Sequence, residues 1–331
     1  MPGPNVPRLP TGYRSAPVRP ADLPEIEALL ADCERELTGR PEAGAGRVAA
    51  DLARPGLVPE LDTVVVRDPA GVVAGWAWVD RRSVVRVRPG HRGRGLGAAL
   101  LDWAETRARQ VGAEQITQVV PDADAAAGVL LRSRGYRPRV TEWLLEYRTA
   151  DGPPTDEPPT DGPPADGAPT DGPSGAPAGL PGVTVRPYRE GDGPALHALV
   201  QDAFDEWQQR RHAYPEWAAH TVGHPGFAPA ATLLALTGGR LLGATVSLHS
   251  QSPDEGWIEQ LAVHPAHRRR GLARHLLHRT FRAFHALGRP VTTLGTHSAT
   301  GALDLYLHVG MHVRRSSTVH RKELAHSREP R

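Results

Sequence analysis

The amino-acid sequence predicts an α/β (α+β) protein built from two similar domains. Two stretches, one from Val87 to Leu101 and one from Val263 to Leu277, keep matching residue types at a constant offset of 176 positions. In each stretch a turn rich in arginine and glycine stands between a predicted strand and a predicted amphipathic helix. The chain has 331 residues, more than one hydrophobic core usually organises. Strands that alternate with helices in both halves complete the prediction.

A segment of unusual composition separates the two halves. Between Ala150 and Gly182 the sequence is dense in Pro, Gly and Asp and contains no aromatic residue, Lys or Arg. Such a segment buries too little apolar area to offset its chain entropy, and its prolines favour extended geometry. A proline motif that docks to a partner domain is the alternative. We expect an N-terminal domain at 1–149, a disordered linker at 150–182, a C-terminal domain at 183–325 and a tail at 326–331.

The first domain is expected to open with a short strand and a helix. After Pro20, the apolar residues Ile26, Leu29 and Leu30 stand at helical spacing. The turn sequence Asp-Pro-Ala-Gly at 68–71 separates two strands, and leucines and alanines lie on one face of a helix that starts at Gly95. The expected elements are a strand at 13–19, a helix after 20–22, a helix at 43–52, strands at 63–67, 72–79 and 84–87, a helix from 95, a strand at 115–120, a helix at 123–133 and a last pair of strands ending near 148.

The second domain is expected to repeat this order. In both domains a strand leads through the turn into a helix and then into another strand, which favours an α/β or α+β architecture. The expected elements are a strand at 183–187, a helix at 195–204, a segment at 214–221, strands at 232–236, 241–250 and 257–263, a helix at 272–284, a strand at 291–296, a helix at 299–308 and a closing strand at 318–324.

Charge and cysteine content narrow the classes of partner. Lys and Arg number 39 against 37 Asp and Glu, a formal charge of only +2, so no global field favours nucleic acid or an anionic membrane. One cysteine, Cys33, allows no internal disulfide and no metal cluster. The sequence shows no charged start followed by an apolar run, and no stretch of about 18 apolar residues. We expect a cytoplasmic monomer or homodimer whose partners are small or locally recognised.

The two turns predict an anion site. In each, a proline redirects the chain after a strand, and small or flexible residues open into a helix whose first N–H groups lack partners and lie at the positive end of the helix dipole. Glycines let the backbone approach a phosphate closely, and arginines add charge-assisted hydrogen bonds. The predicted ligand is therefore a pyrophosphate. The residues concerned are Gly93, Gly95, Gly97, Gly271, Arg92, Arg94, Arg268, Arg269 and Arg270.

Other patterns compete with this interpretation. No Gly-Lys-Ser/Thr follows either turn, as a P-loop requires, and the glycines at 93, 95 and 97 lack the Gly-x-Gly-x-x-Gly spacing of a dinucleotide site. A glycine-rich helix entry with solvated arginines is the plainer alternative. The second copy in matching context makes that alternative harder to sustain.

The turns resemble the acyl-CoA signature of the GCN5-related N-acetyltransferases (GNAT). Arg-x-x-Gly-x-Gly/Ala follows a Val-x-Pro strand end in both copies, and Gly135-Tyr136 and Tyr306-x-x-x-Gly310-Met311 stand downstream. The resemblance implies two GNAT-like domains, each a mixed, mostly antiparallel sheet flanked by helices, with acetyl-CoA as co-substrate and no metal. It also implies that strand-end backbone bonds the pantetheine arm and that the turns hold the pyrophosphate. The residues so implied are Val85, Arg86, Val87, Arg92, Gly93, Arg94, Gly95, Leu96 and Gly97 in the first domain, and Leu261, Ala262, Val263, Arg268, Arg269, Arg270, Gly271, Leu272 and Ala273 in the second.

The same resemblance implies catalytic residues in the second domain. Acetyl transfer to an amine requires a base, an oxyanion donor and an acid for the departing thiolate. Glu259, on the strand that feeds the turn, is implied as the base, and Tyr306, on the following helix, as the acid. Internal alignment places Ser83 and Leu131 at the equivalent positions of the first domain. We therefore expect a catalytic C-terminal domain and a catalytically degenerate N-terminal domain that binds acyl-CoA silently or serves as scaffold.

Plainer roles for these residues stay open. Tyr306 also fits a half-buried helix aromatic, and Glu259 a solvated strand residue or an ion-pair partner. Many relatives have Asn before the tyrosine helix, where this chain offers Ser298 as an alternative helix cap. His297 and His308 are alternative proton shuttles. Several histidines crowd the second turn without carboxylate or cysteine partners, so we expect no metal there: His264, His267, His275, His278, His297, His308 and His312.

The acceptor is expected to lie against the first helices of the second domain. Aromatic and acidic residues there suit a cationic amine with an apolar or sugar-like body, although helix core is the alternative for the aromatics. The two-unit layout is distantly similar to that of mycothiol synthase. The predicted function is acetyl transfer to a primary amine of a small molecule; the alternatives are a protein or peptide N-acetyltransferase and a non-catalytic acyl-CoA-binding protein. The candidate acceptor residues are Phe204, Asp205, Glu206, Trp207, Tyr214 and Trp217.

Overall fold

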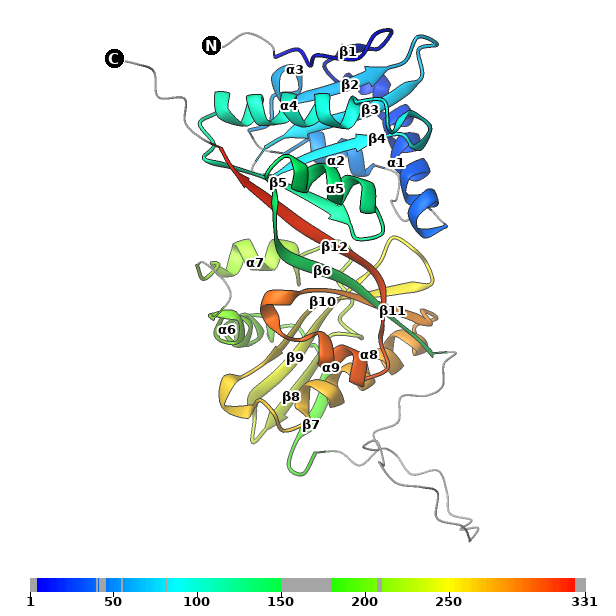
Figure 1. Ribbon diagram of the computed structural model, residues 1–331. Coiled ribbons are helices and arrows are strands. Elements are labelled where there is room, and N and C mark those ends of the chain that lie inside the picture. The colour runs from blue at the N-terminus through cyan, green and yellow to red at the C-terminus, as the bar shows by residue number, and fades with distance from the viewer. Residues whose placement is uncertain are drawn as a thin grey trace, which may run out of the picture. The chain divides into compact units, whose positions relative to one another are not determined.

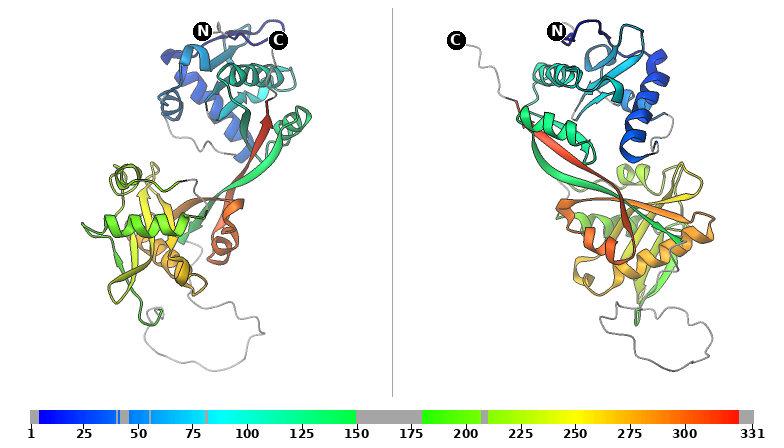
Figure 2. Two further views of the ribbon diagram at one scale, coloured as in Figure 1. Left: turned by 90° about the vertical axis from the view of Figure 1, so that its left-hand side faces the viewer. Right: turned by 45° about the vertical axis from the view of Figure 1, so that its right-hand side comes forward.

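In the computed structural model the chain divides into two units, each built of strands and helices (Figures 1 and 2). Unit 1 consists of Met1–Glu142 with Ser316–Arg331, and unit 2 consists of Trp143–Arg315. Almost all of the predicted linker lies outside the described residues. The predicted tail and Trp207 lie outside them as well. The structure describes residues 5–39, 41, 46–54, 56–80, 82–149, 180–206 and 210–324.

Unit 1 is built on a mixed sheet with the strand order β1-β2-β3-β4-β5-β12. Neighbouring strands are antiparallel except β4 and β5, which run parallel and pair only where Ser83 faces Gln118. The two parallel strands therefore diverge almost at once. The strands are β1 (Arg14–Ala16), β2 (Thr63–Arg67), β3 (Val73–Val79), β4 (Ser83–Val87), β5 (Gln115–Pro121) and β12 (His312–Glu323).

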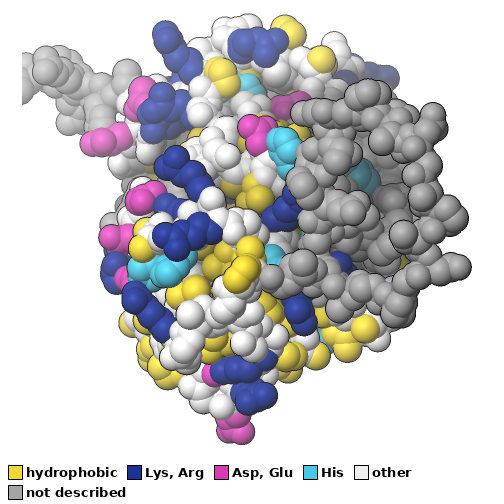
Figure 3. All heavy atoms as spheres, turned by 90° about the horizontal axis from the view of Figure 1, so that it is seen from below, with side chains coloured by type: hydrophobic (Ala, Val, Ile, Leu, Met, Phe, Trp, Pro, Cys, Tyr) yellow, Lys and Arg dark blue, Asp and Glu magenta, His cyan; other side chains and the backbone are white. Residues whose placement is uncertain are grey.

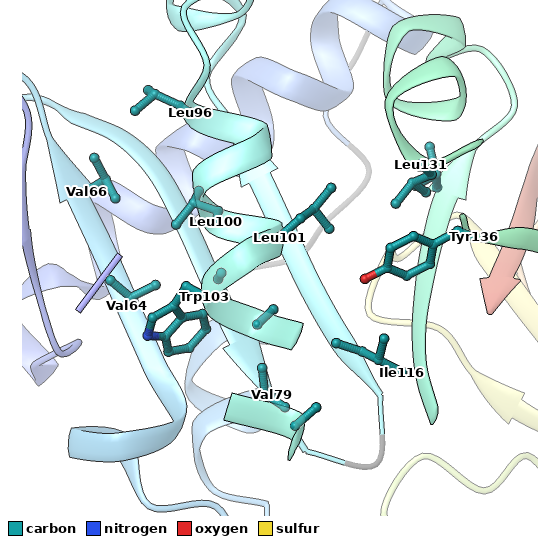
Figure 4. Close-up of a cluster of buried hydrophobic side chains, with 14 of the residues drawn as sticks. Val64, Val66, Val79, Leu96, Leu100, Leu101, Trp103, Ile116, Leu131 and Tyr136 are labelled. Carbon is teal, nitrogen blue, oxygen red and sulfur yellow. The ribbon is translucent and has the colours of Figure 1, made fainter. Parts of the chain in front are cut away.

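Helices cover both faces of the unit 1 sheet. Side chains alternate along a strand, so Val64 and Val66 of β2 join the cluster under α4 and α5, while Val65 joins the cluster under α1 and α2. Figure 4 shows the first cluster, in which Leu100 and Trp103 of α4 pack among the strand residues. The helices are η1 (Pro20–Asp22), α1 (Leu23–Thr38), α2 (Arg47–Leu52), α3 (Pro59–Asp62), η2 (Pro89–His91), α4 (Leu96–Gln110) and α5 (Ala125–Ser133).

Unit 2 repeats this plan with the strand order β6-β11-β10-β9-β8-β7. The pairs from β7 to β10 are antiparallel, and β10 and β11 run parallel. Leu234 of β8 packs under α6 and α7, whereas its neighbours Leu233 and Ala235 pack under α8. The strands are β6 (Arg137–Arg148), β7 (Thr184–Pro187), β8 (Leu233–Thr237), β9 (Arg240–His249), β10 (Glu255–Val263) and β11 (Val291–His297); the helices are α6 (Gly193–Phe204), α7 (Tyr214–His220), η4 (Pro265–His267), α8 (Leu272–Ala286), η5 (Ser298–Thr300) and α9 (Leu303–His308).

The last strand of the chain contributes to unit 1. From Ser317 to Glu323, β12 pairs with β5, and the ammonium of Lys322 lies 2.6 Å from a carboxylate oxygen of Glu105 on α4. An unpaired β5 would leave its backbone groups without partners at a sheet edge, and β12 supplies them. In return, the end of β6 packs Leu145 and Tyr147 into the core of unit 2. The units therefore differ from the predicted contiguous domains, 1–149 and 183–325, at these strands.

The predicted fold class is confirmed: the chain is α/β (α+β), and in each unit mixed, mostly antiparallel strands are flanked by helices. Three local predictions were wrong. One continuous strand, β6, replaces the expected pair ending near 148, and β12 begins at His312, earlier than expected. The helix expected at 299–308 is divided into η5 and α9, whose N-cap is Ala302, so Ser298 is not its cap.

Candidate active site

In unit 2 the strands β10 and β11 diverge next to the turn. Their parallel pairing runs from Glu255 to Ile258 on β10, whereas β10 itself continues, paired with β9, to Val263. A register shift between Ile258 and Gln260 sets a bulge at Glu259. Beyond it, the described ladder gives β10 no partner on the β11 side. The predicted pantetheine contacts, at Leu261 to Val263, fall on this unpaired edge.

The turn after β10 has the geometry of a phosphate cradle. Arg269 has a φ of 58° and Gly271 a φ of 78°, both in the left-handed region. The first hydrogen bond of α8 runs from the His275 N–H to the Gly271 carbonyl, so the N–H groups of the first turn stay available for an anion. Unit 1 has the same conformation, with φ values of 72° at Gly93 and 84° at Gly95. The sequence repeat is thus also a repeat of backbone geometry.

Two of the five predicted phosphate arginines are held by other partners. Arg268 donates to the Ala203 carbonyl at 2.8 Å and lies 3.3 Å from Glu206. Arg92, its equivalent in unit 1, pairs with Glu36 and with Asp124. Both tie the turn to neighbouring helices. The phosphate contacts of Arg92 and Arg268 stay a prediction, in which each guanidinium would have to share its present partners with the phosphate.

The remaining arginines of the turns point to solvent. Arg94 in unit 1, and Arg269 and Arg270 in unit 2, are exposed. Within the described part of the chain their guanidinium groups make no ion pair. They can therefore meet a diphosphate without giving up a partner.

Glu259 is exposed at the bulge of β10 and is oriented by a neighbour on the same strand. The indole N–H of Trp257 donates to the Glu259 Oε2 atom at 2.6 Å. Trp257 in turn lies beside Gly295 of β11, where an added Cβ would stand 3.4 Å from the indole ring. Our sequence reasoning missed Trp257, although strand alternation places residues 257 and 259 on one face.

Tyr306 lies in the apolar cluster below the strand divergence. It is 8% exposed and belongs to the same cluster as Ile258 of β10 and Leu294 of β11. Its hydroxyl makes no hydrogen bond within the described residues and is not fully enclosed. Burial raises the pKa of Tyr306 to about 12, so the phenol is a proton donor at neutral pH. Tyr306 is thus a core aromatic residue, and its hydroxyl is still available as a proton donor.

The predicted acceptor residues have mixed roles. Trp217 is buried and donates its indole N–H to the Gln260 Oε1 atom at 3.0 Å, which brings α7 onto β10. Phe204 packs against the same core, as its plainer role predicted. Tyr214 is 37% exposed and lies edge-on to the ring of His197. Asp205 pairs with Arg211 and Glu206 with Arg268, so two of the acidic groups are engaged.

Unit 1 has no counterpart of the carboxylate at the bulge in its described β3–β4 ladder. The sequence alignment of Glu259 with Ser83 was wrong: Val79 faces Ser83 as Ser247 faces Ile258, so Ser83 matches Ile258 and Glu259 is the extra residue of the bulge. Ser83 is buried, donates to the Thr117 carbonyl at 2.8 Å and accepts from the Gln118 amide at 2.7 Å. Leu131 is part of the core shown in Figure 4. Ser83 thus ties β4 to β5 at the one position where they pair, and Leu131 fills the place of the tyrosine.

The histidines around the second turn do not gather into a metal site. The rings of His264 and His267 meet edge to face, with 5.6 Å between their centroids, and His275 and His278 are buried on α8. No group of three or more potential metal ligands occurs in the described ranges. The Nδ1 atom of His297, a predicted alternative proton shuttle, is buried without a hydrogen-bond partner.

Figure 3 shows one face of the molecule. In the visible part of the face in Figure 3, Lys and Arg side chains are interspersed with acidic and hydrophobic ones. No helix in the described part of the chain has the length and apolar character needed to cross a membrane.

Comparison with known proteins identifies the family. The GNAT acetyltransferase family model matches residues 29–136 and 194–311, one match in each half of the chain. A search of curated proteins finds no match.

Similar solved structures carry the same architecture over nearly the whole chain. A GCN5-related N-acetyltransferase from Sphaerobacter thermophilus is 28% identical, with a TM-score of 0.74 over 96% of this chain and 97% of that one. A tandem GNAT protein from the clavulanic acid biosynthesis pathway is 18% identical, with a TM-score of 0.66 over 95% and 99% of the two chains. The latter likeness shows the fold alone. With a family match in each repeat, the chain belongs to the GNAT acetyltransferase family and is a tandem member of it.

Proposed function

We propose that the protein transfers the acetyl group of acetyl-CoA to a primary amine of a small molecule, and that unit 2 carries the chemistry. The difference between the repeats carries this proposal. Unit 2 has an exposed carboxylate, Glu259, at the strand bulge and a buried phenol with a free hydroxyl, Tyr306. The described β3–β4 ladder of unit 1 has no bulge residue that matches Glu259, and Leu131 stands at the position of Tyr306.

The residues of unit 2 fit an acyl-CoA. The left-handed turn at Arg269 and Gly271, the available N–H groups of α8 and the exposed guanidinium of Arg270 suit a diphosphate. The unpaired edge of β10 from Leu261 to Val263 suits the amide groups of a pantetheine arm. When bound, the thioester supplies an electrophilic carbonyl and a thiolate leaving group.

The chain's own groups then handle the protons. Glu259, held by Trp257, accepts a proton from the incoming ammonium, directly or through water, which frees the nitrogen lone pair. The amine nitrogen forms the new C–N bond, the C–S bond breaks, and Tyr306 gives its phenolic proton to the sulfur. The amine's second proton returns through solvent to the phenolate, which restores the neutral tyrosine.

The direct test is a thiol-release assay on the full chain. Aminosugars, polyamines, arylalkylamines and short peptides are offered with acetyl-CoA, and products are confirmed by mass. We expect turnover with at least one small amine, reduced about 10²–10⁴-fold in Glu259→Gln and in Tyr306→Phe. Glu190→Gln, an exposed glutamate before α6, serves as control and should keep full turnover.

Three results would contradict the proposal in different ways. Turnover with peptides alone would move the substrate to protein amines. Acetyl-CoA binding without any acetylated product would favour a non-catalytic binding protein. Full turnover in both variants would remove Glu259 and Tyr306 from the mechanism.

A further inference from the structure

The two units carry different side chains at one pair of facing residues beside the strand divergence. The β3–β4 and β9–β10 ladders correspond pair by pair: Gly75 faces Val87 as Gly243 faces Val263. One step inward, Trp76 faces Arg86 in unit 1, whereas Ala244 faces Ala262 in unit 2. A tryptophan and an arginine thus stand where unit 2 has two methyl groups.

The Arg86 side chain spans the divergence of β4 and β5. Its guanidinium donates to the Val85 carbonyl on its own strand at 2.9 Å and to the Val119 carbonyl on β5 at 3.3 Å. These strands pair only at Ser83, so the guanidinium occupies the place of the missing ladder bonds. Trp76, 1% exposed, faces Arg86 across the strand pair and limits where its stem can move.

The end of β4 is also engaged within unit 1. The Val87 carbonyl accepts from the Cys33 thiol and from the Arg92 Nε atom, each at 3.4 Å. Carbonyls of Val85 and Val87 are therefore already used by side chains of the same unit. An incoming amide group would have to displace them, and the Arg86 guanidinium would lose its hydrogen bonds to the Val85 and Val119 carbonyls.

Unit 2 has no comparable obstacle at the equivalent position. The side chain of Ala262 is a methyl group that packs against the α6 and α7 core, too short to reach β11. The backbone geometry of the turn is the same in both units, so the difference lies in the strand divergence and not in the phosphate cradle.

We infer that Arg86 closes unit 1 to the pantetheine arm, so that the chain binds one acyl-CoA, in unit 2 alone. This inference rests on the proposed function, because it presumes that unit 2 binds acetyl-CoA between its diverging strands. Arg86 is then a specificity-determining residue by exclusion, and unit 1 is not a silent acyl-CoA site.

The test counts binding sites on the full chain by calorimetry with acetyl-CoA. The wild type should bind one equivalent, and Arg86→Ala, which installs the residue of unit 2, should bind two. Arg82→Ala, which removes an exposed arginine just before the same strand, should bind one. Arg94→Ala and Arg270→Ala occupy equivalent exposed positions of the two turns: the single wild-type site should weaken at least threefold in Arg270→Ala and stay unchanged in Arg94→Ala.

A second readout reports on unit 1 alone and needs no introduced label. Cys33 is the only cysteine, so its alkylation rate, followed by intact mass, is a probe of the end of β4. Acetyl-CoA should leave that rate unchanged in the wild type and slow it at least threefold in Arg86→Ala.

The outcomes separate the inference from the proposed function. Four results would each overturn the role of Arg86 and leave the proposed function standing. They are binding of two equivalents by the wild type, loss of the wild-type site in Arg94→Ala, protection of Cys33 by acetyl-CoA in the wild type, and binding of only one equivalent by a folded Arg86→Ala protein. No wild-type binding at all would overturn the proposed function, and the inference with it.

Discussion

The indole N–H of Trp257 lies 2.6 Å from the Oε2 atom of Glu259, two positions further along β10. A bulge falls at Glu259, where the ladder to β11 ends. The hydrogen bond therefore orients a carboxylate that stands at the strand divergence. We expect Trp257 to act as a positioning residue for Glu259, because its indole donates to the carboxylate.

Replacing Trp257 by Phe keeps an aromatic ring and removes the N–H donor. We expect kcat to fall about tenfold, because a hydrogen bond to a charged group contributes on the order of 1.5–3 kcal/mol. The KM for acetyl-CoA should stay within about twofold, since the turn is untouched. Steady-state kinetics on the best amine of the panel measure both constants.

The matched control for this prediction is Trp103→Phe. It removes an indole donor that bonds the Asn5 carbonyl at 2.8 Å in unit 1, away from the proposed chemistry. Its kcat should equal that of the wild type. A Trp257→Phe enzyme with unchanged kcat would mean that Glu259 needs no such support or takes no part.

Arg269 is strained in a way that its counterpart in unit 1 is not. It is the only described residue other than glycine with a positive φ, 58°, where unit 1 has Gly93 at 72°. A left-handed conformation costs a non-glycine residue roughly 1–2 kcal/mol, and glycine's greater freedom in the unfolded chain offsets part of the gain. Arg269→Gly should therefore raise the free energy of unfolding by about 0.5–1 kcal/mol while weakening acetyl-CoA binding several-fold.

The reciprocal change tests whether strain explains this result. A Cβ added at Gly93 would meet no atom within 4 Å, so Gly93→Arg costs backbone strain and not a clash. It should lower the free energy of unfolding by about 1 kcal/mol and leave acetyl-CoA affinity unchanged. Urea unfolding and calorimetry measure the two quantities. A destabilised Arg269→Gly protein would show that the arginine side chain stabilises the turn by more than its backbone costs.

Much of the fold was predictable because the repeat supplied a check on every element. Strand alternation and helical spacing placed β2 and the starts of α4 and α8 closely, and matching positions such as Gly95 and Gly271 located both turns. The exchange of β12 into unit 1 was not predictable in this way, because the partner of a strand depends on tertiary contacts such as Lys322 with Glu105.

The candidate site was predictable in type but not in partners. The sequence identified Glu259 and Tyr306 as candidates. It could not show that Arg268 pairs with Glu206 and Arg92 with Glu36, because these partners are distant in sequence. Arg86 was predicted as a backbone contact for pantetheine. Only the three-dimensional arrangement reveals that its side chain bridges to β5.

Lys322 is the only lysine of the chain, and it anchors the exchanged strand. Its partner Glu105 is buried, with Arg109 and Arg134 each 3.6 Å away. Lys322→Met should lower the free energy of unfolding by about 2 kcal/mol, since it leaves a buried carboxylate with only the two longer ion pairs.

A double-mutant cycle separates the pair from simple packing loss. Glu105→Gln/Lys322→Met should be more stable than the sum of the two single changes predicts, by at least about 1 kcal/mol, because neither charge is then left unpaired. Urea unfolding measures all four proteins. Additive effects in this cycle would show that β12 is held by its backbone ladder and not by this ion pair.

The raised pKa of Tyr306 predicts a specific loss of stability in alkali. Burial raises the pKa from 10.0 to about 12, so between these two pH values the folded chain keeps a proton that the unfolded chain releases. Because the folded state then binds more protons than the unfolded state, the free energy of unfolding falls as pH rises, by up to roughly 2–3 kcal/mol from this residue. Below pH 10 both states are protonated and the contribution vanishes.

Tyr306→Phe has no proton to release, so its stability relative to the wild type should be constant from pH 7 to 9 and should improve by that amount between pH 10 and 12. Urea unfolding at each pH measures the difference; a difference independent of pH would mean that the phenol ionises as readily in the folded unit as in the unfolded chain, and that it is not the buried donor required for the departing thiolate.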